Sequence, residues 1–220
     1  MTLKLEVEDI KKSYGKKTVL DGVSLSAEGG SCTGLLGANG CGKSTLLSIL
    51  AGIMKPDGGS FDIKGAEDGK KPVIGYVPQG TPLIEELSAM DNLRLWYDKE
   101  ALDESLSGGV LKTLGVDTFL KVPVKKMSGG MKKCLSIGCA VASDPDVLLL
   151  DEPTAALDLA RKDTIYAYMS RFKSKGGIVL IATHDIHEIE FCDRCYLFED
   201  HRLSDYDYNG DVHALAGLMR

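Results

Sequence analysis

The chain has 220 residues and a formal net charge of -6 at pH 7, with 44% hydrophobic and 26% charged residues. This composition is typical of a globular protein with one domain, or one domain and a subdomain. The acidic balance argues against a nucleic-acid-binding surface, which normally carries a basic stripe.

The amino-terminal residues lack the apolar core of a signal peptide, and no apolar run reaches the ~18 residues of a transmembrane helix. We therefore expect a cytoplasmic protein, whose role at a membrane, if it has one, depends on a partner. Alternation of apolar residues at Leu3, Leu5 and Val7 predicts a half-buried strand. Residues 19–27 and 60–63 predict further strands, so we expect an antiparallel β subdomain at the edge of the core.

A phosphate-binding loop lies between a predicted strand at 31–36 and a predicted helix at 45–51. It matches the pattern G-x-x-x-x-G-K-[ST] from Gly37 to Ser44. Glycines let backbone N–H groups face a phosphate, and the helix start adds unpaired N–H groups and a positive dipole end. We expect Lys43 to reach the β- and γ-phosphates of ATP and Ser44 to bind Mg²⁺. The predicted phosphate-contacting residues are Gly37, Asn39, Gly40, Cys41, Gly42, Lys43, Ser44 and Thr45.

Two carboxylates follow a second strand. The apolar run at 147–151 predicts a central parallel strand that ends at Asp151, with Glu152 directly after it. Asp151 suits a Mg²⁺ ligand beside the phosphate loop, and Glu152 can orient or deprotonate a water. The alternative is an ordinary polar turn at the end of a strand, which the neighbouring phosphate loop disfavours.

Two more polar residues follow predicted buried strands. Gln79 comes after a strand at 73–77, and His184 comes after a strand at 178–182. Ligands of α/β proteins bind at the carboxyl ends of the strands, so we expect both side chains on the nucleotide side. Each signal is weak when taken alone.

The segment between the predicted strands at 73–77 and 147–151 is predicted to be mainly helical. Helical spacing of apolar residues occurs in three stretches: 83–96, 110–119 and 131–142. We predict a helical subdomain at about 83–145, inserted into an α/β core formed by 1–82 and 146–220. The apolar residues of the first stretch have two interpretations, a groove for a membrane partner or internal packing.

Six cysteines are present, and a reducing cytosol keeps cysteines as thiols. Cys192 and Cys195 have C-x-x-C spacing. A metal site would need a second pair of ligands, and a thioredoxin-like site would open a helix after a strand. Here the motif precedes the apolar run 195–198, a predicted strand, so we favour structural thiols over a redox or metal role.

Taken together, the motifs resemble those of the ATP-binding domain of ABC (ATP-binding cassette) transporters, in the same order and over nearly the whole chain. The resemblance implies that Tyr14 stacks on adenine and that Asp158 belongs to the D-loop. It implies that Gln79 touches Mg²⁺ or water and links to the membrane partner. It makes Glu152 the catalytic glutamate and His184 the switch histidine. The predicted catalytic residues are Lys43, Gln79, Glu152 and His184, and the predicted Mg²⁺ ligands are Ser44, Gln79 and Asp151.

The run from Met127 to Met131 resembles the family's signature, which is usually Leu-Ser-Gly-Gly-Gln. Ser128 can cap a helix that begins at Gly129, and Gly129 and Gly130 leave its N–H groups bare for a second anion site. The resemblance implies that two copies pair head to tail, with each ATP between the phosphate loop of one copy and this segment of the other. Met127 should matter little, whereas Met131 removes one polar contact.

The sequence thus predicts an ATP-hydrolysing subunit of an ABC transporter that binds ATP and Mg²⁺. We expect it to pair with a second ATP-binding subunit as a homodimer, and to act on separate integral membrane subunits at the inner face of the cell membrane. The compact length leans toward export. The alternative is a soluble ABC ATPase without a transport role, such as a component of a cluster-assembly scaffold, and the co-purifying partner would distinguish the two. No nucleic-acid partner is expected.

Overall fold

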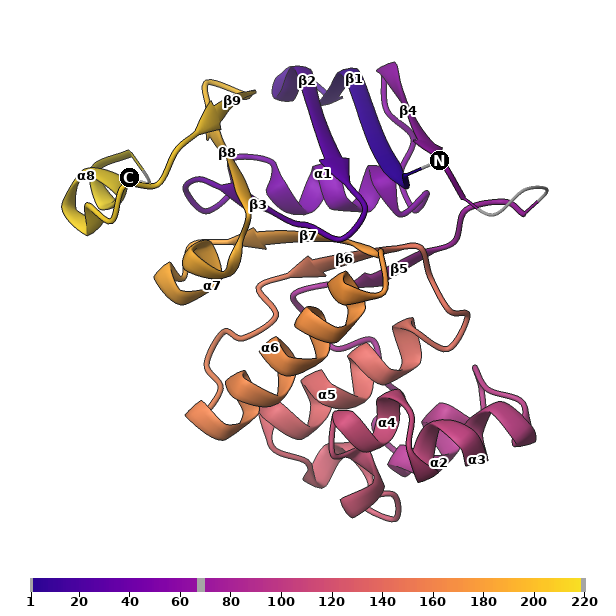
Figure 1. The fold of residues 1–220 in the computed structure, drawn as a ribbon. Helices are drawn as coiled ribbons and strands as arrows, with labels where there is room; N and C mark the ends of the chain where they lie inside the picture. Colours follow the sequence, from indigo (N-terminus) through magenta and orange to yellow (C-terminus); the bar gives the residue numbers. More distant parts are fainter. Residues whose placement is uncertain (1, 67–69, 219–220) are drawn as a thin grey trace.

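The computed structural model describes residues 2–66 and 70–218 and contains two β-sheets and two groups of helices (Figure 1). The strands are β1 (Lys4–Tyr14), β2 (Lys17–Glu28), β3 (Cys32–Leu36), β4 (Gly58–Lys64), β5 (Ile74–Val77), β6 (Val147–Asp151), β7 (Ile178–Thr183), β8 (Arg194–Glu199) and β9 (Arg202–Tyr206). The α-helices are α1 (Lys43–Leu50), α2 (Ala89–Leu93), α3 (Lys99–Ser107), α4 (Val110–Thr113), α5 (Gly129–Ala140), α6 (Leu159–Ser174), α7 (Ile186–Phe191) and α8 (Val212–Leu218). Short 3₁₀ helices are η1 (Val116–Thr118) and η2 (Val124–Lys126).

The smaller sheet is antiparallel, with strand order β2-β1-β4, which confirms the predicted antiparallel arrangement. Leu5 and Val7 are buried on its inner face, while Glu6 and Glu8 lie on the other face. The period-two pattern of the sequence therefore follows one buried and one solvated side.

The larger sheet has strand order β5-β6-β7-β3-β8-β9. Pairing is parallel from β5 to β8, and only β9 runs antiparallel. Every residue of β3, β6 and β7 is buried, because helices or the second sheet cover both faces. This explains why these strands are continuous apolar runs without alternation, and it confirms the predicted mostly parallel sheet.

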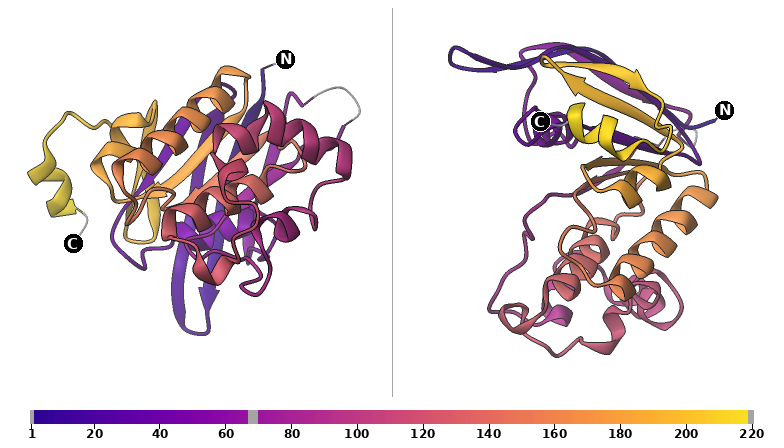
Figure 2. Two further views of the ribbon diagram at one scale, coloured as in Figure 1. Left: turned by 90° about the horizontal axis from the view of Figure 1, so that it is seen from below. Right: turned by 90° about the vertical axis from the view of Figure 1, so that its left-hand side faces the viewer.

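The two larger of the three hydrophobic cores in the described part of the chain lie on opposite faces of the larger sheet. One fills the space between this sheet, α1 and the antiparallel sheet. The other lies between the sheet and the helices that include α5 and α6. Figure 2 shows α2–α5 gathered on the side away from the antiparallel sheet. Within the described residues no helix is both long and apolar enough to cross a bilayer.

The helical prediction for 83–96 is wrong over most of its length, because only Ala89–Leu93 is helical. The flanking backbone bonds to a distant segment instead: Ala89 N–H donates to Val122 O, and Val124 N–H donates to Leu87 O. The predicted stretch at 131–142 corresponds to α5, which begins two residues earlier, whereas α3 gave no recognised signal. The boundaries of the subdomain at about 83–145 remain a proposal.

Candidate nucleotide-binding site

Four loops meet at one edge of the larger sheet. Its neighbouring strands β5, β6, β7 and β3 are parallel and in register, with Asp151 paired to Ala182 and Leu36 paired to Thr183. Their carboxyl ends therefore carry the loops that follow them to the same edge. These loops hold the phosphate-binding motif, Glu152, Gln79 and His184, and Asp151 ends β6 at the same edge.

The phosphate loop contains three glycines with positive φ, Gly37, Gly40 and Gly42. Gly37 has φ of 146° and Gly42 has φ of 124°, conformations that L side chains rarely adopt. A Cβ at Gly42 would also lie 2.8 Å from Leu20 Cδ2. The Lys43 ammonium, at a residue only 6% exposed, donates to Gly37 O at 2.7 Å and Ala38 O at 3.0 Å. Phosphate oxygens carry more charge than these carbonyls and can compete for the same donors.

A cleft of about 560 Å³ opens beside this loop. It is lined by Tyr14, Lys17, Val19, Asn39, Gly40, Gly42, Lys43, Ser44, Thr45, Gln79, Asp151, Glu152 and His184. The aromatic ring of Tyr14 is half exposed, and its Oη lies 3.0 Å from Met54 Sδ. The cleft thus combines an aromatic wall, a loop of backbone amides and a group of carboxylates.

Glu152 is the centre of a polar trio. Its Oε2 accepts a hydrogen bond from Gln79 Nε2 at 2.8 Å, and its Oε1 lies 3.0 Å from His184 Nδ1. Glu152 has φ of 47°, a left-handed conformation that costs a non-glycine residue energy and tends to occur at functional sites. The turn therefore aims this side chain between residues from two neighbouring strands.

Asp151 is 3% exposed and lies beside Ser44, whose hydroxyl bonds to it. Burial raises the pKa of Asp151, the charge of Glu152 adds to the rise, and the Ser44 hydroxyl opposes it. Oxygen donors of this kind suit Mg²⁺, which proteins usually hold through one or two carboxylates together with substrate phosphates. Among residues 2–66 and 70–218, no group of three or more His, Cys, Asp or Glu side chains could hold a metal ion by itself.

Other predicted site residues lie outside the cleft. Ser128 caps α5 by accepting a hydrogen bond from Met131 N–H at 3.2 Å, and Asp158 caps α6 in the same way. Gly129 and Gly130 open α5 and do not line the cleft either. Within one chain, therefore, the phosphate loop and the signature segment form separate surfaces.

Cys41 lies within the phosphate loop, but its side chain does not line the cleft. Its Sγ lies 3.8 Å from Lys43 Nζ and packs close to Gly37, where an added Cβ would be 2.9 Å away. The thiol therefore lies against the inner side of the loop rather than facing the cleft.

Two buried charged residues near the site escaped the sequence analysis. Lys133 on α5 is 5% exposed; burial lowers its pKa, while the carboxylates of Asp151, Glu188 and Glu152 oppose that shift. Glu188 on α7 is 1% exposed, and its Oε1 accepts from Thr154 N at 2.8 Å and Oγ1 at 2.5 Å. Burial raises the pKa of Glu188, and the bonds from Thr154 oppose the rise. Neither residue lies in a recognisable motif. Lys133 also follows Lys132 directly, and two adjacent lysines in a predicted helix usually indicate a solvent-exposed face.

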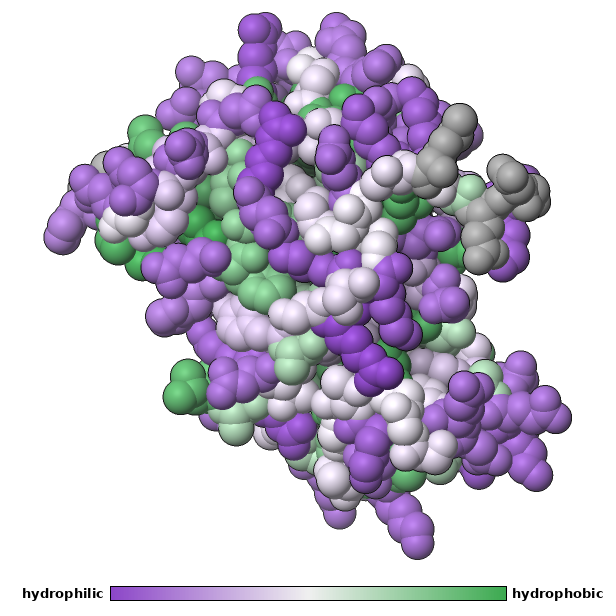
Figure 3. Space-filling model, in the orientation of Figure 1, coloured by the Kyte–Doolittle hydropathy of each residue, from purple (hydrophilic) through white to green (hydrophobic). Residues whose placement is uncertain are grey.

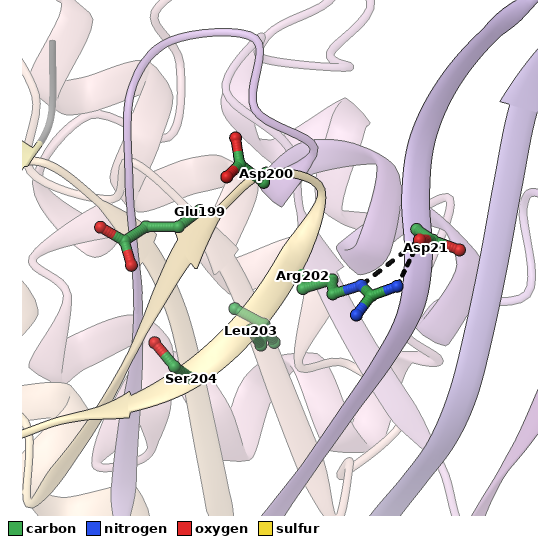
Figure 4. A pocket seen from close by; sticks show the side chains of 6 residues that line it. All are labelled: Asp21, Glu199, Asp200, Arg202, Leu203 and Ser204. Atoms are coloured by element: carbon green, nitrogen blue, oxygen red, sulfur yellow. Dashed lines mark hydrogen bonds and ion pairs between the residues drawn. The ribbon is translucent and has the colours of Figure 1, made fainter.

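A second hollow lies at the turn between β8 and β9 (Figure 4). Its charged groups include Arg202, whose guanidinium is already paired with Asp21 at 2.9 Å. The remaining charged lining residues, Glu199 and Asp200, are both acidic. This hollow has none of the phosphate-binding features of the larger cleft.

All six cysteines are free thiols. The C-x-x-C pair lies at the end of α7 and the start of β8, where the sequence predicted a strand. Cys192 Sγ lies 3.6 Å from Cys32 Sγ and donates to Glu188 O at 3.1 Å. The hydrogen bond with Cys192 raises the pKa of Cys195, and burial adds to the rise. At Cys192 the bond with Cys195 lowers the pKa, but the bond with Cys32 and burial outweigh it and raise the pKa. Raised pKa values disfavour reactive thiolates.

Comparison with known proteins agrees with this geometry. The model of the family described as ABC transporter matches residues 20–155, more than half of the chain, so the chain belongs to the ABC transporter family. The linearmycin resistance ATP-binding protein LnrL of Bacillus subtilis (strain 168) is 36% identical over 200 residues, covering 86% of this chain and 64% of LnrL. The lantibiotic transport ATP-binding protein SrtF of Streptococcus pyogenes is 35% identical over 188 residues, covering 84% and 82%.

A Nod factor export ATP-binding protein I, from Paraburkholderia xenovorans (strain LB400), is 34% identical over 208 residues, covering 90% of this chain and 68% of that protein. Among solved structures, an ATP-binding subunit of an ABC transporter superposes with a TM-score of 0.81 at 28% identity, covering 98% and 94%. The dimeric ATP-binding cassette MJ0796, in a post-hydrolysis state with ADP and Pi, gives 0.80 at 26% identity, covering 94% and 99%. The fold is thus that of an ABC-type ATP-binding protein.

Proposed function

We propose that this chain hydrolyses ATP as the energy-supplying subunit of an ABC exporter. The observation that carries the proposal is the position of Glu152, held between Gln79 and His184 at the edge of the cleft beside the phosphate loop. A cleft that only bound a nucleotide would not need a carboxylate that is held in one orientation by Gln79 and His184. The relatives named for resistance, lantibiotic transport and Nod factor export support the direction of transport.

Nucleotide binding would use the preformed parts of the cleft. Tyr14 offers a face for the adenine ring, and the loop amides and Lys43 offer donors for the phosphates. Mg²⁺, held by Ser44, Asp151 and Gln79, would neutralise charge on the phosphate oxygens when bound. These groups follow or end β3, β5 and β6 of the same sheet, so they would reach the phosphates from different positions along its edge.

Hydrolysis would depend on Glu152 as the base for the attacking water. One carboxylate oxygen already bonds Gln79, and the other faces His184, so the carboxylate is oriented before a water arrives. Such orientation places the proton acceptor without further rearrangement. His184 stays half exposed, and we propose that it contacts the γ-phosphate.

The signature segment supports a dimer. Ser128 leaves further N–H groups at the start of α5 free to bind an anion, yet they lie outside the cleft of the same chain. A second copy, placed head to tail, would bring them to the phosphates held by the first. Asp158 and the exposed Leu159 then belong to the same dimer face.

A membrane subunit would contact the segment that follows Gln79. Leu93 is fully buried, but Ile84, Leu95 and Trp96 are 47%, 58% and 64% exposed. The stretch packs inward through Leu93, as the packing interpretation expects, and its exposed apolar residues support contact with a membrane partner. On the face shown in Figure 3, hydrophilic residues gather mainly at the rim, and residues of intermediate or hydrophobic character lie across the middle. We propose that the three exposed residues bind the membrane subunit, which would hold the chain at the inner face of the membrane.

Two experiments test the proposal. Purified protein should release phosphate from ATP in a Mg²⁺-dependent manner, and Lys43→Ala should abolish this; wild-type turnover in Lys43→Ala would contradict the site assignment. A tagged chain should then co-purify with an integral membrane protein from detergent extracts. Trp96→Lys should lose that partner while it keeps its ATPase activity. Val212→Lys, at an exposed apolar residue of α8, is the surface control. Recovery of a soluble assembly scaffold instead would favour the non-transport alternative.

A further inference from the structure

Lys133 is a buried cation that binds the loop carrying Gln79. It lies in the second turn of α5, and only 5% of the residue is exposed. Its ammonium donates to Pro78 O at 3.3 Å and to Gln79 O at 3.4 Å. A lysine is rarely fully buried unless it is paired, so this side chain requires an explanation.

The neighbouring residue gives the contrast. Lys132 lies one position earlier on the same helix and forms an ion pair with the exposed Glu85 at 3.4 Å. Its position is that of an ordinary surface lysine, whose pair contributes little to stability. Lys133 instead turns inward, toward the carboxyl ends of the sheet, where the charges of Asp151 and Glu152 attract it.

By binding the carbonyls of Pro78 and Gln79, Lys133 connects helix α5 to the loop after β5. Pro78 and Gln79 belong to the loop after β5, while α5 begins at the signature segment. Both bonds are long, so the attraction is that of one charge shared between two carbonyl dipoles. It fixes the backbone of Gln79 and therefore the place from which Nε2 reaches Glu152 Oε2.

We propose that Lys133 is a positioning residue for Gln79, which it holds in place by binding the backbone carbonyls of Pro78 and Gln79 from the signature helix. The inference rests on the proposed ATPase function. It predicts an effect on turnover rather than on nucleotide affinity, because Lys133 contacts neither the phosphate loop nor Tyr14 and does not line the cleft.

The variant Lys133→Met tests this, with Lys132→Met as the matched control. Methionine keeps the apolar stem of the side chain, and a thermal melt of the variant checks that the fold is retained. We expect kcat for ATP to fall about tenfold, as for other residues that orient a metal or catalytic ligand, with KM changed less than about twofold. Lys132→Met should change neither value. Lys133→Arg, which keeps the charge, should restore most of the lost kcat.

A double-variant cycle separates positioning from general damage. In a Gln79→Ala background, Lys133→Met should cost almost nothing further, because the residue it positions is gone. An additive loss of kcat, or a kcat within about twofold of wild type for Lys133→Met alone, would overturn the inference.

A measurement without turnover keeps the two proposals apart. The side-chain amide of Gln79 can be assigned by NMR from the signal missing in Gln79→Ala. Lys133→Met should move this signal toward the position of a free glutamine amide, and Lys132→Met should leave it in place. An unmoved signal overturns the role of Lys133. Absence of ATPase activity in the wild type would instead refute the proposed function.

Discussion

Replacement of Glu152 by glutamine tests the water-activating role directly. The carboxylate accepts from Gln79 Nε2 at 2.8 Å and lies 3.0 Å from His184 Nδ1. Glutamine has the same shape and keeps an acceptor oxygen for Gln79, but its amide cannot take a proton from water. We therefore expect the fold to be retained and turnover to fall by about 10²–10⁴-fold. Such a loss corresponds to about 3–5 kcal/mol on the barrier.

The same variant should trap a dimer. Lys43 and the phosphate loop are unchanged, so Mg-ATP should still bind, while hydrolysis no longer releases the pair. We expect an ATP-dependent dimer on size-exclusion chromatography and loss of phosphate release in a coupled assay. A second change, Ser128→Arg, should abolish the dimer because a bulky cation would occupy the phosphate position at the start of α5.

Two outcomes would refute the reasoning. Turnover of Glu152→Gln within about tenfold of wild type would show that another group accepts the proton, because loss of a general base costs more than this. A dimer that persists in the variant with both Glu152→Gln and Ser128→Arg would show that the signature segment does not contact the nucleotide. ATP binding, followed by equilibrium dialysis, is the control that both variants must pass.

Further predictions concern the loop, the fold and its pH dependence. Alkylation of Cys41 should weaken ATP binding about tenfold or more by displacing the Lys43 ammonium beside it, and Mg-ATP should protect the thiol, as labelling followed by mass spectrometry can check. Gly59→Ala, whose Cβ would lie 2.3 Å from Asp9 O at φ of 79°, should destabilise by about 3 kcal/mol or more, whereas Gly52→Ala meets no atom and should cost only about 1–2 kcal/mol by thermal melting. The raised pKa of Glu188 shows that the fold favours its neutral carboxyl. The stabilising contribution of this group is therefore present below pH 4.5 and is lost as pH rises through the folded pKa. Glu188→Gln should reduce this pH dependence of stability, as thermal melts at several pH values can check.

The positions of the strand ends at the candidate site could be predicted from the local sequence. The buried strand predicted at 147–151 coincides with β6, because its four consecutive apolar residues before Asp151 favour a strand covered on both faces. Parallel pairing then brings the residues after β5, β6 and β7 together, whatever the loops between them contain. Gln79 and His184 could be placed for this reason, although each is weak as a motif.

The region after Gln79 could not be predicted in the same way. The apolar residues at 83–96 have helical spacing, but Asn92 bonds Ile84 through its side chain, and Ser88 bridges to Pro123. Such non-local bonds replace helical ones and leave no trace in the periodicity of a single segment. Lys133 was missed for a related reason, since its burial depends on carbonyls more than fifty positions away.

Gly129 offers a test in which stability and function should change in opposite directions. A Cβ at this position meets no atom of its own chain, whereas one at Gly130 would lie 2.8 Å from Arg161 Cγ. Aspartate at position 129 would lie in the first turn of α5, where a negative charge stabilises a helix by about 0.3–1 kcal/mol. The melting temperature of Gly129→Asp should therefore equal or exceed that of the wild type.

The same charge would face the phosphates of a nucleotide bound by a second copy. We expect Gly129→Asp to prevent the ATP-dependent dimer in the Glu152→Gln background, while Gly129→Asn, of equal size and without the charge, weakens it less. The two effects have one electrostatic origin, because the helix start that attracts the introduced carboxylate is the one proposed to attract phosphate. If Gly129→Asp melts at a higher temperature and still dimerises with ATP, no phosphate approaches this helix start. If it melts lower than Gly129→Asn, the helix start does not hold an anion at all.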